Sequence, residues 1–271
     1  MLIDTHCHLD FERFDEDRDE VLQRARDAGV RAIVVPAIDL NNCSAVLALA
    51  ERYVGVQAAV GVHPNSTSEW HSSWIDLLRP LAVRPSVVAI GEIGLDYYWE
   101  DAPHEAQHRA FTAQLELAAE LSLPVIVHNR EAGEDVIRLL SESSLASTER
   151  PGVLHSFSDT LDVAMAGIDL GFYIGLTGPV TFKNADDLRQ IVSALPLERI
   201  LVETDAPFLA PQPRRGKRNE PAYIIYMVEQ IAELFNLSVE EVARNTTENA
   251  RRLFGAQLDS DEAPTAFLQK E

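Results

Sequence analysis

The sequence has little lysine, little cysteine and no long apolar run. Lysine occurs only at positions 183, 217 and 270, and cysteine only at positions 7 and 43. Two cysteines are too few for a disulfide framework and fit a reducing compartment. No run of about 18 apolar residues offers a membrane span, and no basic stretch followed by an apolar one marks a signal peptide. These absences predict a cytoplasmic protein that does not enter a membrane.

Basic residues are outnumbered by acidic ones, and the formal net charge of the chain is −20. This balance argues against a broad electrostatic grip on a nucleic-acid duplex and against binding to an anionic membrane surface. The length of 271 residues suits one large α/β barrel as well as two small domains. A hydrophobic fraction of 46% is that of an ordinary soluble globular protein.

Short apolar runs rich in Val and Ile alternate with segments of helical spacing. The runs predict strands buried on both faces, at 2–6, 31–35, 56–62, 86–91, 124–128, 152–155, 171–176 and 199–203. The helical segments lie at 16–28, 41–52, 73–83, 103–122, 132–145, 159–168, 184–194, 221–235 and 238–254. This order favours an α/β fold, a single-domain (β/α)8 TIM barrel, over an open doubly wound sheet, because no G-x-G-x-x-G follows the first strand. We expect the barrel at 1–256 and a solvated tail at 257–271.

Metal-ligating side chains gather where the predicted strands end. Five of the eight histidines do so, together with three carboxylates: His6, His8, His63, His128, His155, Glu92, Glu203 and Asp205. Active sites of these barrels lie at the carboxyl ends of the strands, so these side chains are expected to meet there. Imidazole and carboxylate together suit divalent transition metals. The set is too large for one open four-coordinate ion and large enough for two divalent ions (Zn²⁺, Mn²⁺ or Mg²⁺) that share a carboxylate.

A basic cluster in this acidic chain follows the last predicted strand. Arg214, Arg215, Lys217 and Arg218 lie within five positions, with Asn219 and Glu220 directly after them. The loop after strand eight commonly holds phosphate in such barrels. The cluster therefore predicts a phosphate-binding loop. Asn219 and Glu220 are expected either to orient this loop or to bind the substrate. The alternative is a solvated basic loop.

Other side chains near the expected site have two interpretations each. His63 either touches a substrate phosphate or is a structural histidine. Tyr97, Tyr98 and Trp99 follow Glu92 and either stack on a nucleobase or cover the rim of the barrel. Cys7 lies between His6 and His8, and alternation along a strand points it to the opposite side, into the core.

Six motifs, in order, make the chain resemble the TatD family of metal-dependent deoxyribonucleases, which are amidohydrolase-like barrels. They are DTHCHLD (4–10), GEIGLDYY (91–98), PVIVHNREA (124–132), VLHSFS (153–158), ETDAPFLAP (203–211) and RGKRNEP (215–221). The resemblance implies one metal on His6, His8, Glu92 and Asp205, and a second on Glu92, His128 and His155. Glu92 would bridge the two ions. No lysine precedes Lys183, so a carbamylated lysine on strand four, the bridge in many related barrels, is not available.

These observations predict a dinuclear metal-dependent phosphodiesterase. The resemblance points to a 3′–5′ exonuclease on single-stranded or frayed DNA ends, with RNA left open, and we expect a monomer. Asp205 is the expected base for the attacking water, Glu92 the bridge, and Glu203 a support for the metal ligands or a substrate contact. His63, Arg214, Arg215, Arg218 and Asn219 are the expected substrate contacts. The alternatives are a metal-dependent amide or ester hydrolase, such as an aminoacyl deacylase, and a non-catalytic metal-binding barrel.

Overall fold

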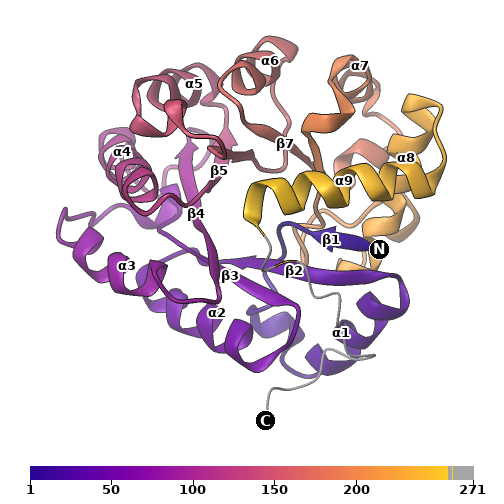
Figure 1. The fold of residues 1–271 in the computed structure, drawn as a ribbon, viewed down its shortest axis with the longest axis horizontal. Helices are drawn as coiled ribbons and strands as arrows, with labels where there is room; N and C mark the ends of the chain where they lie inside the picture. The colour runs from indigo at the N-terminus through magenta and orange to yellow at the C-terminus, as the bar shows by residue number, and fades with distance from the viewer. Residues whose placement is uncertain (256–257, 259–271) are drawn as a thin grey trace. The chain divides into compact units, whose positions relative to one another are not determined.

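The computed structural model describes residues 1–255 and 258 (Figure 1). Within these residues, eight strands alternate with α-helices along the chain. The strands are β1 (Leu2–Asp4), β2 (Val30–Pro36), β3 (Val56–Val60), β4 (Val87–Asp96), β5 (Val125–Arg130), β6 (Gly152–Leu154), β7 (Tyr173–Leu176) and β8 (Ile200–Val202). The helices are α1 (Arg18–Asp27), α2 (Leu40–Arg52), α3 (Trp74–Ala82), α4 (His104–Leu121), α5 (Gly133–Glu142), α6 (Leu161–Asp169), α7 (Asp186–Ala194), α8 (Ile224–Phe235) and α9 (Val239–Phe254).

The strands form one eight-stranded sheet in which their order is the order of the chain. The described pairs β1–β2, β3–β4, β4–β5, β5–β6 and β6–β7 are all parallel. Parallel strands need a crossover between them, and a helix supplies it after each strand. This is the topology of the (β/α)8 barrel, so the predicted fold class is confirmed.

Two compact units share the chain, and neither is continuous in sequence. The terminal unit consists of Met1–Val35, Leu49–Gln57 and the chain from Gly175 onward. The central unit consists of Pro36–Ala48 and Ala58–Ile174. The predicted tail, 257–271, lies outside the described residues except for Leu258.

Helix α9 packs on two strands of the terminal unit. It begins with a capping box, in which the Ser238 hydroxyl accepts from the Glu241 N–H while the Glu241 carboxylate accepts from the Ser238 N–H. Its buried face packs on β1 and β8, and Figure 1 shows it running alongside β1. Asn249 donates to the carbonyls of Leu197 and Ile200, each at 2.9 Å, which fixes the start of β8. The helix therefore anchors the two strands that lead to His6 and Asp205.

Helix α4 anchors the central unit through two buried glutamines on its inner face. Gln114 accepts from the Val62 N–H at 2.8 Å and donates to the Val62 carbonyl at 3.1 Å. Gln107 accepts from the Asp96 N–H at 2.8 Å and donates to the Asp96 carbonyl at 2.9 Å. Buried amides of this kind satisfy backbone groups where the strand pairing ends. Both strand ends that precede candidate site residues are fixed in this way.

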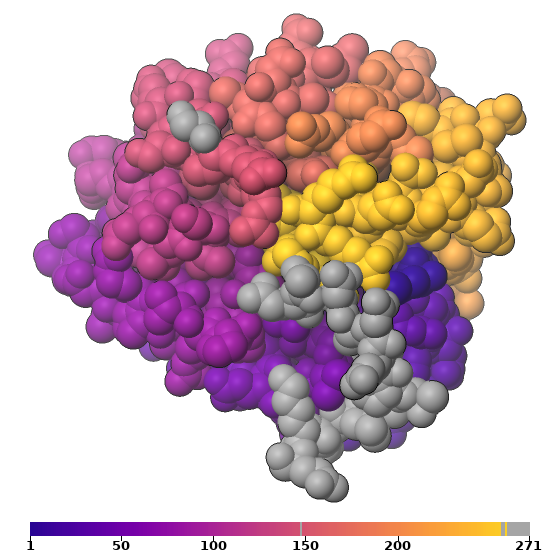
Figure 2. Space-filling model, viewed as in Figure 1, coloured from indigo at the N-terminus to yellow at the C-terminus, as the bar shows by residue number. Residues whose placement is uncertain are grey.

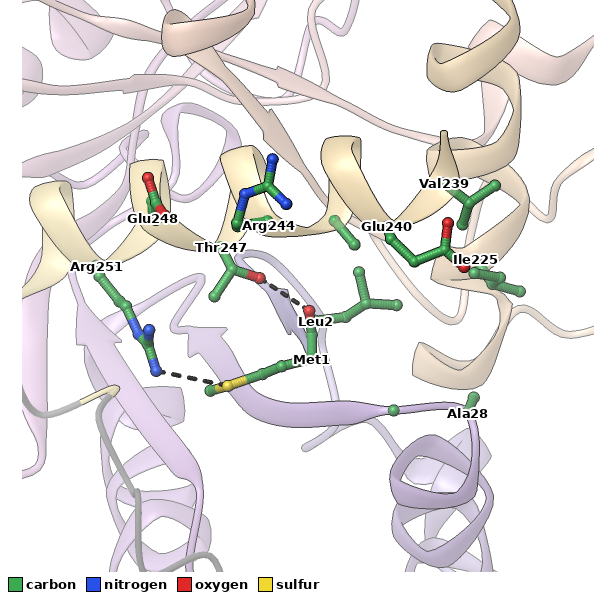
Figure 3. Close-up of a pocket in the computed structure, with 12 residues that line it drawn as sticks. Met1, Leu2, Ala28, Ile225, Val239, Glu240, Arg244, Thr247, Glu248 and Arg251 are labelled. Carbon is green, nitrogen blue, oxygen red and sulfur yellow. Dashed lines mark hydrogen bonds between the residues drawn. The ribbon is translucent and has the colours of Figure 1, made fainter. Parts of the chain in front are cut away.

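A pocket of about 430 Å³ opens in the terminal unit beside the first residues of the chain (Figure 3). Figure 2 shows this face, with the N-terminal residues next to the surface of α9. Thr247 donates to the Met1 carbonyl at 3.0 Å, and a guanidinium nitrogen of Arg251 lies 3.5 Å from the Met1 sulfur. The pocket lies at the start of β1, whereas His6 and His8 follow its end. It is therefore separate from His6 and His8. Among the described helices, none is long and apolar enough to cross a bilayer.

Candidate metal centre

His6, His8 and Asp205, here called the His6 group, come together in the terminal unit. His6 and His8 follow β1, and Asp205 follows β8. The Nε2 atoms of the two histidines are 3.2 Å apart. Oδ1 of Asp205 lies 3.7 Å from Nε2 of His6 and 3.5 Å from Nε2 of His8. Two imidazole nitrogens and one carboxylate oxygen thus face a common point, as predicted for three of the metal ligands.

Backbone hydrogen bonds hold the two segments of the His6 group in register. The Asp205 N–H donates to the His6 carbonyl at 2.9 Å, and the His8 N–H donates to the Ala206 carbonyl at 2.8 Å. Between them, Cys7 forms a parallel bridge with Ala206 and is fully buried, in agreement with its predicted core position. Asp205 has a left-handed backbone with φ of 54°. Such a backbone is uncommon outside glycine and is tolerated best by Asp and Asn.

Asp4, which the sequence analysis did not single out, ties the same two segments together. One carboxylate oxygen accepts from the Thr204 N–H at 2.9 Å and from the His6 N–H at 3.3 Å. The other accepts from the Thr204 hydroxyl at 2.5 Å. Burial raises the pKa of Asp4 to about 7, although these hydrogen bonds act in the opposite direction. Its place at the start of DTHCHLD was the available signal.

Glu203 ends in a closed environment in the terminal unit. Its side chain is fully buried, and one carboxylate oxygen lies 3.2 Å from the Thr5 hydroxyl, which donates to it. A Cβ atom at Gly175 would stand 2.4 Å from the same carboxylate, so the glycine leaves the space that Glu203 fills. The predicted catalytic or supporting role of Glu203 stays a prediction.

Glu92, His63, His128 and His155, here called the Glu92 group, come together in the central unit. All three imidazoles face the same oxygen of Glu92. Its distance is 2.9 Å to Nδ1 of His128, 3.5 Å to Nε2 of His155 and 3.6 Å to Nε2 of His63. The Glu92 side chain is 3% exposed, so its charge is shielded from bulk water. The predicted ligands Glu92, His128 and His155 are thus neighbours, and the predicted substrate contact His63 lies with them.

The positions of Glu92 and His128 within their strands differ from the prediction. Glu92 was expected just beyond the strand 86–91 and His128 as the last residue of the strand 124–128, but β4 continues to Asp96 and β5 to Arg130. The pairing of β4 with β5 is irregular between Ile90 and Ile93, and it resumes with Ile93 opposite Val127. An irregularity of this kind re-aims a side chain within a strand. The apolar run ends at Glu92. The strand predicted from that run is therefore shorter than the strand defined by backbone pairing.

The hydrogen bonds of His63 decide which ring nitrogen carries its proton. Nδ1 of His63 accepts from the Asn65 N–H at 3.2 Å. In a neutral imidazole one nitrogen accepts and the other donates, so Nε2 of His63 carries the hydrogen. That N–H faces Glu92. His63 therefore offers a donor to an oxygen atom rather than a lone pair to a metal, which favours the predicted substrate contact over a ligand role.

His128 has the opposite arrangement, with carboxylates on both sides of its ring. Nδ1 is 2.9 Å from Glu92, and Nε2 is 2.9 Å from Oδ2 of Asp96. Burial alone would lower the pKa of His128, but the hydrogen bonds to Asp96 and Glu92 raise it above its ordinary value. A divalent ion at Nδ1 would therefore displace a proton there.

The donor sets of the two groups fit divalent metal ions. Within His6, His8 and Asp205, one ligand atom from each residue lies within 4.8 Å of the others, and the same holds for His63, Glu92 and His128. Imidazole nitrogens mixed with carboxylate oxygens are the ligands of Zn²⁺, Mn²⁺ and Fe²⁺ sites. The predicted cofactor class therefore agrees with the side chains, and the tautomer argument puts His155 ahead of His63 as a ligand beside His128.

The basic cluster makes several contacts within the terminal unit. Arg218 pairs with both oxygens of Asp17, each at 2.7 Å. The guanidinium carbon of Arg214 lies 5.1 Å from the ring centre of Tyr223, and that of Arg215 lies 4.0 Å from the ring centre of Phe182. Asp17 and Tyr223 lie directly before helices α1 and α8, which are labelled in Figure 1. A phosphate contact of this cluster stays a prediction.

Asn219 and Glu220 shape the loop that carries the basic cluster. Asn219 is fully buried and donates to the carbonyls of Thr204 and Phe208, at 2.8 Å and 2.7 Å. Glu220 accepts from Arg24 at 2.7 Å. Both Asn219 donors are thus engaged within the loop after β8. Its predicted substrate contact is untested.

The three aromatic residues after β4 have different environments. Tyr97 donates to Asp135 at 2.6 Å, and its ring stacks on His104 at 4.0 Å between centres. Tyr98 and Trp99 are 49% and 56% exposed. The structure therefore leaves Tyr98 and Trp99, but not Tyr97, with an accessible ring for the predicted base stacking.

Comparisons with known proteins agree with the fold. The profile of the family described as TatD related DNase matches residues 3–255. A protein of Bacillus subtilis named uncharacterized metal-dependent hydrolase YabD is 43% identical over 254 residues, covering 94% of this chain and 99% of that protein. A Shigella flexneri protein named 3′-5′ ssDNA/RNA exonuclease TatD is 38% identical over 260 residues, covering 94% and 99%.

A solved structure extends this likeness to the backbone. The crystal structure of the TatD homologue YjjV from Escherichia coli superposes with a TM-score of 0.88 at 37% identity, covering 93% of this chain and 97% of that chain. The residues matched by the family profile, 3–255, include both ligand groups and the loop after β8. With the family profile and these relatives, the chain belongs to the TatD family.

Proposed function

We propose that the protein is a dinuclear metal-dependent phosphodiesterase that removes nucleotides from the 3′ end of single-stranded or frayed DNA. The observation that carries this proposal is one oxygen of Glu92 facing three imidazole nitrogens, in a chain of the TatD family. A relative at 38% identity bears the name of a 3′-5′ ssDNA/RNA exonuclease, and that name supports both the bond cleaved and the polymer. RNA ends are the second polymer to test.

The two ligand groups divide the metals between them in this proposal. His6, His8 and Asp205 would hold one ion, His128 and His155 would hold the other, and Glu92 would be a ligand of both. Two bound divalent ions would polarise the phosphoryl oxygen and lower the pKa of a water molecule, which is the chemistry this site needs. We further propose that the protein acts as a cytoplasmic monomer.

Side chains of this protein accept the proton and bind the phosphates. The Asp205 carboxylate is partly open to solvent, with 14% of its side chain exposed, and accepts a proton from the attacking water. Nε2–H of His63 donates to a phosphate oxygen, because its Nδ1 is already engaged by Asn65. An arginine of the basic cluster contacts the next phosphate, since the planar guanidinium matches two phosphate oxygens.

A pair of phenylalanines beside His8 suits a nucleobase. Phe208 is 39% exposed, and its ring centre lies 6.2 Å from His8 and 5.7 Å from Phe11. The Arg13 guanidinium carbon lies 5.5 Å from the Phe208 ring centre. Stacking of a base on an aromatic side chain contributes roughly 1–3 kcal/mol. We expect Phe208→Ala to raise KM for ordinary DNA ends about 5-fold or more, and to leave KM for an end that lacks its terminal base unchanged.

The net charge of −20 limits the length of nucleic acid that the protein can hold. A long duplex across the surface would be repelled, because tight nonspecific binding needs many cations near the phosphates. Two bound ions and the basic cluster would concentrate positive charge in one place instead. This distribution favours a short single-stranded end as the substrate.

Hydrolysis of an amide or ester is the second candidate, because the same ligands serve it and several relatives bear the general name metal-dependent hydrolase. The test is to incubate the purified protein with Mn²⁺, Mg²⁺ or Zn²⁺ and single-stranded DNA labelled at the 5′ or the 3′ end. A panel of amides and esters, including an aminoacyl ester, is run in parallel. The control is the Glu92→Gln variant, which keeps the size of the side chain.

A 3′–5′ exonuclease gives a progressive ladder from 5′-labelled DNA and releases a labelled mononucleotide at once from 3′-labelled DNA. Both products must disappear in Glu92→Gln. Cleavage of an amide or ester that depends on Glu92, with intact DNA, would replace the proposal by the second candidate. No turnover of any substrate, with metal bound, would favour a non-catalytic barrel.

A further inference from the structure

Asp96 is a buried carboxylate at the end of β4 that has no assigned role. It is 2% exposed. Gln107 of α4 holds its backbone N–H and its carbonyl. Its Oδ1 accepts from the N–H groups of Tyr98 and Trp99, each at 3.0 Å. The carboxylate is therefore fixed in direction, since one of its oxygens is engaged by the turn that follows β4.

The second oxygen of Asp96 faces the ring of His128. Oδ2 lies 2.9 Å from Nε2 of His128, while Nδ1 of that ring lies 2.9 Å from Glu92. An ionised carboxylate only accepts hydrogen bonds, so it requires a hydrogen on Nε2. Glu92 accepts a hydrogen bond from Nδ1–H of the metal-free ring in the same way. An ion beside Glu92 would displace that hydrogen, while the one on Nε2 stays with Asp96 and leaves the lone pair on Nδ1. Thus Asp96 selects the tautomer that can bind a metal beside Glu92.

We propose that Asp96 is the positioning residue of the second metal: it fixes the ring and the tautomer of His128 so that Nδ1 is directed at an ion shared with Glu92. Metal-binding histidines commonly donate their other N–H to a carboxylate, which orients the ring and makes it a stronger ligand. This inference rests on the metal site of the proposed function. It does not depend on the substrate, because metal binding is measured without one.

The substitution Asp96→Asn tests the tautomer and preserves the turn. The Asn oxygen can still accept from Tyr98 and Trp99. If the Asn side-chain amide were turned the other way, its NH2 group would face the N–H groups of Tyr98 and Trp99, and donors would oppose donors. The NH2 group must therefore face His128. It would donate to Nε2, and the ring hydrogen would move to Nδ1, where it blocks the metal.

A matched control is Asp159→Asn. Asp159 accepts from the side chain of Asn129, the residue after His128, at 2.9 Å and does not face an imidazole. The substitution Asp159→Asn therefore removes one carboxylate charge near His128 without changing the tautomer of its ring. Thermal unfolding of the metal-free proteins shows whether either variant damages the fold.

The measurement is titration of each protein with Zn²⁺ and with Mn²⁺, using a competing chelator, together with ¹⁵N spectra of the histidine rings in the zinc-loaded protein. For Asp96→Asn we expect one ion to bind with unchanged affinity and the other roughly 10–100-fold more weakly. The ¹⁵N signal of a metal-bound Nδ1 of His128 should be lost. Asp159→Asn should bind both ions as the unaltered protein does, and all three should unfold at similar temperatures.

Three results would overturn the inference. Two ions bound by Asp96→Asn with unaltered affinity would show that Asp96 does not position His128. Equal weakening of both ions together with a lower unfolding temperature would make Asp96 a structural residue only. If the unaltered protein binds a single ion, the metal centre of the proposed function fails as well. If it binds two ions but does not cleave DNA, only the substrate part of that function fails.

Discussion

The His6 group and the Glu92 group use the same ligand types but are held in place differently. In the His6 group, main-chain bonds join the segments after β1 and β8, and Asp4 bonds to the backbone of both. In the Glu92 group, the ligands project from strands, and side chains orient one another, as Asp96 does for His128. Backbone hydrogen bonds hold both groups, because the N–H groups of His63, Glu92 and His155 also donate to main-chain carbonyls. The Glu92 group adds side-chain hydrogen bonds to a ligand ring. Substitutions should therefore affect the two groups separately.

The largest effect is expected at Glu92, which the proposal places between the two ions. Glu92→Gln keeps the shape of the side chain but removes the charge that faces three imidazoles. We expect both ions to bind more weakly by more than the roughly 10–100-fold typical of an outer partner, and hydrolysis to fall to background. Metal analysis after dialysis is the measurement, and Glu116→Gln on the surface of α4 is the control. Loss of only one ion would mean that Glu92 does not bridge.

Asp205→Asn should separate the groups, since Asp205 belongs to the His6 group alone. Hydrolysis should be lost, at least about 100-fold, because the proposed base and one metal ligand are removed together. The ion at His128 and His155 should stay bound. Metal content of the purified variant decides between the outcomes, and a protein without either ion would show that the ligands are divided wrongly.

Thr204→Val tests the backbone positioning of the His6 group without changing a ligand. It removes the hydroxyl that bonds to Asp4, and Asp4 is fully buried. A buried group that loses its partner costs about 1–3 kcal/mol, so the free energy of unfolding should drop by that amount. The affinity for the ion at His6 and His8 should fall, and that at the Glu92 group should not.

The matched control for this variant is Thr246→Val, whose hydroxyl bonds only within α9. Chemical denaturation of both variants, followed by metal titration, is the measurement. An equal loss of stability in the two variants would show that the hydrogen bond between Thr204 and Asp4 contributes no more than that of the Thr246 hydroxyl within α9.

The smallest effect is expected at Asp17, which pairs with Arg218 of the loop after Asp205. The hydrogen bond from Arg218 lowers the pKa of Asp17, against the effect of partial burial. The pair therefore stabilises the fold above the ordinary pKa of 3.8, and this contribution is lost as the pH falls through the lowered value. Asp17→Asn should cost about 0.5–1 kcal/mol at pH 7. The difference should shrink as the pH is lowered from 7 through the lowered pKa of Asp17, and denaturation over a series of pH values would check it; a cost that does not change with pH would exclude a charge effect.

Sequence reasoning found most elements because the apolar runs and the helical spacing are regular. It placed the ends of β2 and α9 within one residue of those observed. It failed at β4, where the polar Glu92 interrupts the apolar run although the backbone pairing continues to Asp96. It also missed Asp4 and Asp96 as partners of ligands. Both lie inside quoted motifs, but spacing alone does not show which side chains a carboxylate will face.

The most direct test of the account is anomalous X-ray diffraction from crystals grown with Mn²⁺ or Zn²⁺. The account predicts two metal peaks about 3.5–4 Å apart, one bound by His6, His8 and Asp205 and the other by His128 and His155. Oxygens of Glu92 should lie about 2.0–2.2 Å from both. A single peak, or two peaks that do not share Glu92, would contradict it.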